Sequence, residues 1–150
     1  MKNLKLAMVA IAIALVAGTW GIQRSSAQPA GKAAPAAAGA PAAPAGFKRV
    51  ELQKHDLSVG GREAVTARGE FQPGAAVPRH THPGEEVGYV VDGELTVEID
   101  GQPAKTVKAG EAFFIPAGTV HAGKNTGKGT TTVLSTYVIE KGKPLATPAK

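Results

Sequence analysis

A chain of 150 residues is long enough for one folded domain, whereas two domains would each have only a thin core. The formal net charge is +5, but the basic residues are scattered among acidic ones without interleaved aromatic residues, which argues against nucleic acid as a partner. The sequence has no cysteine, which excludes disulfide bonds and thiolate ligands, so any metal must be bound by nitrogen and oxygen atoms.

The N-terminal residues 1–27 have the pattern of a signal peptide. Two lysines precede the apolar stretch LAMVAIAIALVA at residues 6–17, and Ser25 and Ala27 are small residues at the −3 and −1 positions of a cleavage site. This pattern predicts a periplasmic or secreted protein with no membrane contact after cleavage. The alternative is an uncleaved N-terminal membrane anchor, although glycines dilute the end of the apolar run.

Residues 28–46 consist almost entirely of alanine, proline and glycine. They cannot bury a core, and their prolines prevent the alanines from forming one long helix, so we expect an extended linker. We then expect one folded domain over residues 47–142 and a C-terminal tail over residues 143–150.

Short alternating apolar runs follow one another from residue 47 to residue 140, separated by glycine, proline, asparagine and aspartate. No long stretch has the 3.6-residue apolar spacing of a helix. The turn residues recur at the spacing of a sandwich or a barrel. The sequence therefore predicts an all-β fold in a single domain.

The stretch RHTHPGEE, residues 79–86, contains two of the four histidines of the chain. Residues i and i+2 of a strand project to the same face, so His80 and His82 would present two imidazoles side by side. Such a pair on its own is more often a polar strand edge than a metal site. A metal site therefore requires further ligands that reach the same point.

The dipeptide Asp92-Gly93 predicts a two-residue type I′ turn in a β-hairpin. Val90 would then pair directly with Leu95, and Glu86 with Ile99. The apolar residues of the second strand would face the interior, and Glu86 would face it with them. Because a buried carboxylate requires a compensating charge, this placement favours a cation beside Glu86.

The same alternation assigns the neighbours of Glu86 to two faces. Gly88 would point inward beside Glu86, where the missing side chain leaves room for a substrate. Val87, Tyr89 and Val91 would point outward. Either the N-terminal strand FKRVEL or a second copy of the chain, in a homodimer, would cover these apolar side chains.

His121 follows a Pro-Gly turn in PAGTVHAGKN and supplies a third candidate imidazole. Three imidazoles and one carboxylate suit one divalent transition metal, and manganese (Mn), iron (Fe), nickel (Ni), zinc (Zn) and copper (Cu) all remain open. Each of these residues alone is a weak signal, but their positions agree with one another in a β-barrel.

Two motifs resemble the signatures of the cupins: GAAVPRHTHPGEEVGYVVDG at residues 74–93 and GEAFFIPAGTVHAGKN at residues 110–125. The resemblance implies a conical jelly-roll β-barrel with a metal inside. It also implies a structural role for Asn125 and a catalytic role for Glu86 in moving protons. The metal ligands that it implies are His80, His82, Glu86 and His121. Glu85, out of phase with Glu86, is expected at the rim of the site.

Four protein ligands would leave one or two positions on the metal open to water, oxygen or a chelating substrate. We therefore predict an exported cupin that acts on a small organic substrate by dioxygenase-like or metal-assisted lyase or isomerase chemistry. The alternative is a non-catalytic, metal-containing module that binds a small molecule, because fold and ligands are shared by many chemistries. Tyr137 could also face the interior. Both faces of its strand are apolar, however, so the sequence does not say which face carries Tyr137.

Overall fold

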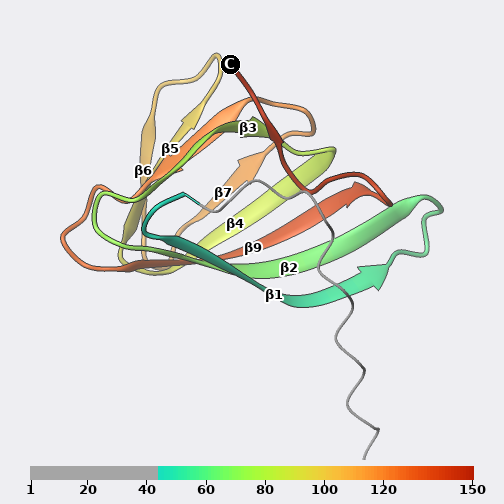
Figure 1. Cartoon of the computed structure of the whole chain (residues 1–150), viewed down its shortest axis with the longest axis horizontal. Coiled ribbons are helices and arrows are strands. Elements are labelled where there is room, and N and C mark those ends of the chain that lie inside the picture. Colours follow the sequence, from blue (N-terminus) through green and yellow to red (C-terminus); the bar gives the residue numbers. More distant parts are fainter. Residues whose placement is uncertain (1–43) are drawn as a thin grey trace, which may run out of the picture. The chain divides into compact units, whose positions relative to one another are not determined.

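The structure is a computed structural model that describes residues 44–150, in which every regular element is a strand (Figure 1). The elements are β1 (Phe47–Asp56), β2 (Arg62–Phe71), β3 (Ala76–Thr81), β4 (Gly84–Asp92), β5 (Glu94–Ile99), β6 (Lys105–Lys108), β7 (Ala112–Ile115), β8 (His121–Lys124), β9 (Thr131–Glu140) and β10 (Thr147–Pro148). Over these residues no helix has the length and hydropathy needed to span a bilayer. The expected signal peptide and most of the expected linker lie outside the described residues.

The strands form two antiparallel five-stranded sheets. The first sheet has the order β1-β2-β9-β4-β7, and the second has the order β10-β3-β8-β5-β6. The two sheets face each other and are joined by strands that alternate between them, as in a jelly roll (Figure 1). This arrangement confirms the prediction of an all-β jelly-roll barrel.

The apolar core fills one part of the space between the sheets. Its buried residues come from both inner faces, because each strand places alternate side chains inward. Phe47 and Phe71 are in contact at its margin, with ring centroids 4.6 Å apart. The buried members are Phe71, Ala75, Val90, Leu95, Val97, Val107, Ile115 and Val133.

The predicted hairpin at Asp92-Gly93 is wrong. The two strands that flank the turn do not pair with each other. Strand β4 pairs with β7 and β9, whereas β5 pairs with β6 and β8, so the chain crosses from one sheet to the other at this turn. Gly93 has a positive φ of 79° but Asp92 does not, whereas a type I′ turn requires both. The predicted inward phase is nevertheless right, because Glu86, Val90 and Leu95 are all buried. Alternation along a strand fixes the phase whichever strand is its partner.

The N-terminal strand does not cover the outer face of β4, as the sequence analysis allowed. β1 pairs with β2 at the edge of the first sheet and extends that sheet. Val87, Tyr89 and Val91 therefore remain about half exposed, together with Phe114 of β7, which pairs with Val87. The sequence analysis gave two alternatives for what covers these apolar side chains, and the second alternative, a second copy of the chain in a homodimer, is the one that remains.

Asn125 fastens the loop between β8 and β9 to the rest of the barrel. Its side-chain amide donates to the carbonyls of Phe71 and Gly129 at 2.9 and 2.8 Å, and its side-chain oxygen accepts from the Gly127 N–H at 2.9 Å. All of the amide's groups are satisfied in a residue with no exposed surface. This hydrogen bonding is the structural role that the family resemblance implied.

Candidate metal centre

The structure brings His80, His82, Glu86 and His121 together between the two sheets. His80 lies near the end of β3, His82 just after it, Glu86 in β4 and His121 at the start of β8. One ring nitrogen from each histidine lies within 4.8 Å of the other two. His82, Glu86 and His121 are 4, 6 and 4% exposed, whereas His80 is only half-buried. The site is therefore enclosed except on the side of His80.

Backbone contacts position the histidines relative to one another. His80 pairs with His121 across β3 and β8, and His121 pairs with Ile99 on the other side. The Gly118 N–H donates to the His82 carbonyl at 3.0 Å, which ties the turn before His121 to the segment after β3. Sheet pairing and this turn contact therefore carry all three rings to one place.

Each of the three imidazoles has its Nδ1 beside a backbone carbonyl. The distances are 2.8 Å from His80 to Pro78 O, 2.9 Å from His121 to Thr119 O and 2.6 Å from His82 to Leu145 O. A carbonyl oxygen only accepts, so each Nδ1 must carry the hydrogen that it donates. In a neutral ring this leaves the Nε2 lone pair free, which is the arrangement that metal-binding histidines have.

The Nε2 atoms converge on each other and on the carboxylate of Glu86. His80 Nε2 lies 3.2 Å from His82 Nε2, and Glu86 Oε2 lies 3.1 and 3.4 Å from Nε2 of His82 and His121. The His121 Nε2 is buried and has no hydrogen-bond partner. Four acceptor atoms facing one another repel unless a proton or a cation lies among them.

A transition metal fits this donor set. Neighbouring ligand atoms that are each about 2.0–2.2 Å from one ion lie roughly 3 Å from one another, which is close to the distances of 3.2, 3.1 and 3.4 Å from His82 Nε2 to His80 Nε2 and from Glu86 Oε2 to Nε2 of His82 and His121. A cation would also engage the unpartnered His121 Nε2. The residues present therefore suit a divalent metal held by nitrogen and oxygen.

The electrostatics of the site favour the metal-binding protonation states of two of the four side chains, Glu86 and His80. Burial alone would raise the pKa of the Glu86 carboxyl, but a proton shared with the rings of His121 and His82 in the metal-free site outweighs burial and holds this pKa well below its usual range. Burial, together with the neighbouring His121, lowers the pKa of His80 to about 4. At neutral pH the site therefore presents a carboxylate and a neutral His80 ring.

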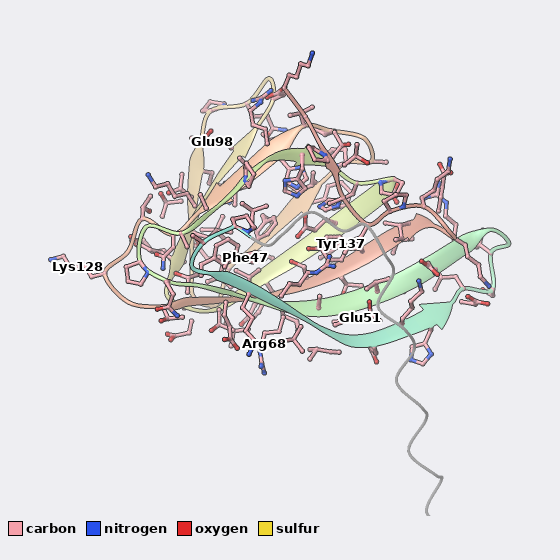
Figure 2. All side chains as sticks on the ribbon, viewed as in Figure 1. Phe47, Glu51, Arg68, Glu98, Lys128 and Tyr137 are labelled. Atoms are coloured by element: carbon pink, nitrogen blue, oxygen red, sulfur yellow. The ribbon has the colours of Figure 1, made fainter. Side chains whose placement is uncertain are left out.

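Tyr137 is a neighbour of the site that the sequence could not place. It faces inward from β9, pairs with Glu86 of β4, and has its ring edge-on to His82 at a centroid distance of 4.8 Å (Figure 2). Burial, reinforced by the nearby Glu86 carboxylate, raises the pKa of Tyr137, so the phenol stays protonated. The equal apolar character of both faces of β9 hid this placement.

The expectation for Glu85, one residue before Glu86, differs in outcome from the expectation for Gly88, two residues after it. Glu85 is out of phase with Glu86, as expected, and its side chain lies on the outer face, paired with Arg62 at 3.8 Å. The expectation that Gly88 leaves room for a substrate is wrong, because a Cβ there would lie 2.1 Å from the Phe113 ring. Phe113 has taken the space that Gly88 leaves, so room for a substrate must lie elsewhere around the site.

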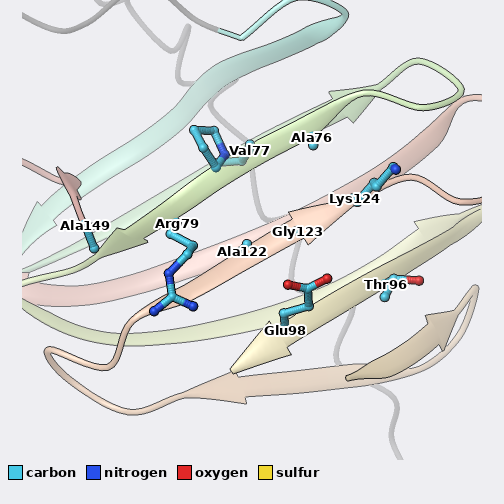
Figure 3. A pocket seen from close by; sticks show the side chains of 10 residues that line it. Ala76, Val77, Arg79, Thr96, Glu98, Ala122, Gly123, Lys124 and Ala149 are labelled. Carbon is cyan, nitrogen blue, oxygen red and sulfur yellow. The ribbon is translucent and has the colours of Figure 1, made fainter. Parts of the chain in front are cut away.

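One groove of the described domain lies away from the four converging side chains. It measures about 430 Å³ and lies on the outer face of β3, β5 and β8, between Arg79, Glu98 and Lys124 (Figure 3). None of the candidate metal ligands lines it. The groove is therefore separate from the chemistry of the metal centre.

Comparisons with known proteins agree with the fold. A family model described as a cupin domain matches residues 67–137. A germin-like protein of Arabidopsis thaliana, subfamily 2 member 2, is 45% identical over 76 residues, which are 47% of this chain and 35% of that protein. Oxalate oxidase 2 of Hordeum vulgare is 42% identical over 69 residues, or 41% of this chain and 31% of that protein.

The solved structures include a recombinant oxalate oxidase in complex with glycolate. It superposes with a TM-score of 0.56 and 30% identity, and the match covers 69% of this chain and 55% of that one. The chain spans about a third of the length of the curated relatives it matches. The likeness therefore concerns one part of those proteins rather than the whole of them.

Proposed function

Because this chain belongs to the cupin superfamily and carries a three-histidine cluster suited to a metal, we propose that it is a metalloenzyme acting on a small organic anion. One divalent transition metal is held by His80, His82, Glu86 and His121. The observation that carries the proposal is the convergence of three Nε2 atoms and one carboxylate oxygen, with every Nδ1 tied to a carbonyl. Such a set has no evident structural purpose without a cation.

The charge of the site favours an anionic substrate. A dication with one carboxylate ligand keeps about one positive charge in a largely buried place, where a negative ligand gains most. Two of the matched relatives support the same class, because one is an oxalate oxidase and another is an oxalate oxidase in complex with glycolate. Small carboxylates, enolates and phenolates are therefore the substrates to test first.

The metal, when bound, supplies Lewis-acid or redox chemistry at its open positions. The protein's own residues bind it, orient the substrate and exclude water. The half-buried His80 marks the side from which a small molecule would reach the centre, since the other three ligands are almost fully buried. Glu86 is the candidate group for moving a proton, and the protonated hydroxyl of Tyr137 nearby is a candidate donor to a substrate oxygen.

The proposal is tested by turnover in the full chain loaded in turn with Mn, Fe, Ni, Zn and Cu. Oxalate, glycolate, simple phenols and flavonols form the panel, and both oxygen uptake and substrate loss are measured. We expect turnover with at least one metal and its loss in His82→Ala, which removes a ligand. Glu85→Gln, on the outer face beside Arg62, serves as the matched control and should retain activity.

Oxygen-dependent turnover would favour dioxygenase-like chemistry, and turnover without oxygen would favour a lyase or isomerase. Equal turnover by wild-type protein and His82→Ala would contradict the proposal. Saturable binding of an anion to the metal-loaded protein without turnover would instead favour the non-catalytic binding module.

Two further expectations accompany this function. We propose that residues 1–27 direct export and are removed, so that an exported protein whose first residue is not Gln28 would contradict the cleavage site.

We also propose that the exposed face of Val87, Tyr89 and Phe114 joins two copies of the chain. Sedimentation of the protein as a monomer at high concentration would contradict the homodimer.

A further inference from the structure

We propose that residues 143–150 form a C-terminal strap that belongs to the metal centre, because the Leu145 carbonyl fixes the ring of His82. The inference rests on the proposed metal site and deepens it by adding a positioning residue that touches no metal. The strap follows the end of β9 and ends beside β3 (Figure 1). Between these two points the Leu145 carbonyl lies beside His82 Nδ1.

The support of His82 differs from that of the other two histidines. His80 and His121 each donate from Nδ1 to the carbonyl two residues earlier, at Pro78 and Thr119. Those acceptors are part of the same strand or turn as the ring. His82 donates to Leu145, which is 63 residues away in the chain. Its orientation therefore depends on a segment that only the folded barrel brings near.

The strap is attached on the side of the first sheet by the Leu145 side chain. Leu145 packs against a buried cluster of four residues that flanks the metal centre, namely Val65, Ala67, Tyr137 and Ile139. Tyr137 in turn contacts the ring of His82. Leu145 therefore joins the strap to this cluster, and its carbonyl oxygen lies 2.6 Å from His82 Nδ1.

The strap is attached on the side of the second sheet by β10. Thr147 and Pro148 pair with Thr81 and His80 of β3. The Ala149 N–H donates to the Arg79 carbonyl at 3.0 Å, and Arg79 Nε donates back to the Lys150 carbonyl at 3.2 Å. Ala149 and Arg79 are seen together at one end of the outer groove (Figure 3). The strap therefore holds the strand that carries His80 as well as the ring of His82.

Loss of the strap has a specific chemical consequence at His82. Without the Leu145 carbonyl, Nδ1 no longer has a fixed acceptor, so the hydrogen can occupy Nε2 and compete with the metal for that atom. Removing such a supporting partner typically weakens metal binding by about 10- to 100-fold. His80 and His121 keep their local carbonyls, so the effect is confined to one of the three imidazoles.

The test compares the full chain with a variant that ends at Pro144 and with Leu145→Ala. The variant ending at Pro144 lacks the carbonyl, whereas Leu145→Ala keeps it and loses only side-chain packing. Zinc affinity is measured by competition with a chelator, and the protonated nitrogen of His82 is identified by ¹⁵N chemical shifts in the metal-free protein. A third protein, with lactic acid in place of Ala146, keeps every side chain but makes the Leu145 carbonyl a weaker acceptor.

We expect the full chain and Leu145→Ala to hold the hydrogen of His82 on Nδ1. The shortened variant and the lactic acid variant should show both tautomers at His82 but not at His80 or His121. Zinc affinity should fall by about 10- to 100-fold in the shortened variant. If the shortened variant does not fold, the lactic acid variant gives the same answer without altering the core.

The inference is overturned if His82 keeps the hydrogen on Nδ1 and zinc affinity is unchanged when the carbonyl is removed or weakened. Failure of the proposed function gives a different result, in which the full chain binds no zinc. The ¹⁵N shifts of the metal-free protein still decide the role of Leu145 in that case.

Discussion

Single residues in the metal centre are held by contacts of very different range. The pattern H-x-H and the inward phase of Glu86 could be read from the sequence because they depend only on alternation within a strand. The inward orientation of Tyr137 could not be predicted from the sequence, since both faces of β9 are apolar. The hydrogen-bond acceptor of His82 could not be predicted either, because no local sequence pattern links His82 to Leu145.

His80 predicts a pH dependence of stability in the metal-free protein. Its pKa is lowered to about 4 in the folded state by burial and the nearby His121, so the unfolded chain, with an ordinary pKa near 6.5, binds this proton first. Stability from this group is therefore complete above about pH 6.5 and is lost as the pH falls toward 4. Because His80 is partly exposed, we expect a loss of about 1 kcal/mol between pH 7 and pH 5.

Urea unfolding of the metal-free protein at several pH values measures this effect. His80→Gln removes the titrating ring and should flatten the curve between pH 7 and pH 5. An equal slope in the wild-type protein and His80→Gln would show that His80 does not carry the pH dependence.

Among the elements, the strand phases could be predicted but the strand partners could not. Asp92-Gly93 has the composition of a hairpin turn, yet the chain uses it to pass from the first sheet to the second. The positive φ of Gly93 and the short distance from its position to Thr131 explain the glycine without a hairpin. Partner choice depends on contacts such as β4 with β9, which lie far apart in sequence.

The contact between β4 and β7 predicts a steric effect at Gly88. A methyl group there would lie 2.1 Å from the Phe113 ring, so Phe113 would have to move within a packed interior. We expect Gly88→Ala to lower the free energy of unfolding by about 1–3 kcal/mol. Gly60→Ala is the control, because nothing lies within 4 Å of that position, and its effect should stay within about 0.5 kcal/mol.

Chemical denaturation of both variants gives the comparison. The double variant Gly88→Ala/Phe113→Ala should show a smaller additional loss from Gly88→Ala than the single variant does, because the clashing ring is gone. Equal stability of Gly88→Ala and the wild-type protein would mean that Phe113 does not fill the space beside Glu86.

For the molecule as a whole, the fold class followed from turn spacing and apolar alternation, and the spacing of two motifs pointed to the cupin barrel. The barrel matters to function because it joins segments that are distant in sequence, from His80 in β3 to Leu145 after β9, around one point. The substrate does not follow from the fold, since one barrel and one ligand set serve many reactions.

The central claim, that four side chains bind one transition metal, is tested most directly by elemental analysis of the full chain purified from its native compartment. The same measurement is made on His82→Ala and on Glu85→Gln, whose side chain lies on the outer face. We predict one equivalent of a transition metal per chain in the wild-type protein and in Glu85→Gln, and a large loss in His82→Ala. Wild-type protein without metal, or His82→Ala with a full equivalent, would contradict the account.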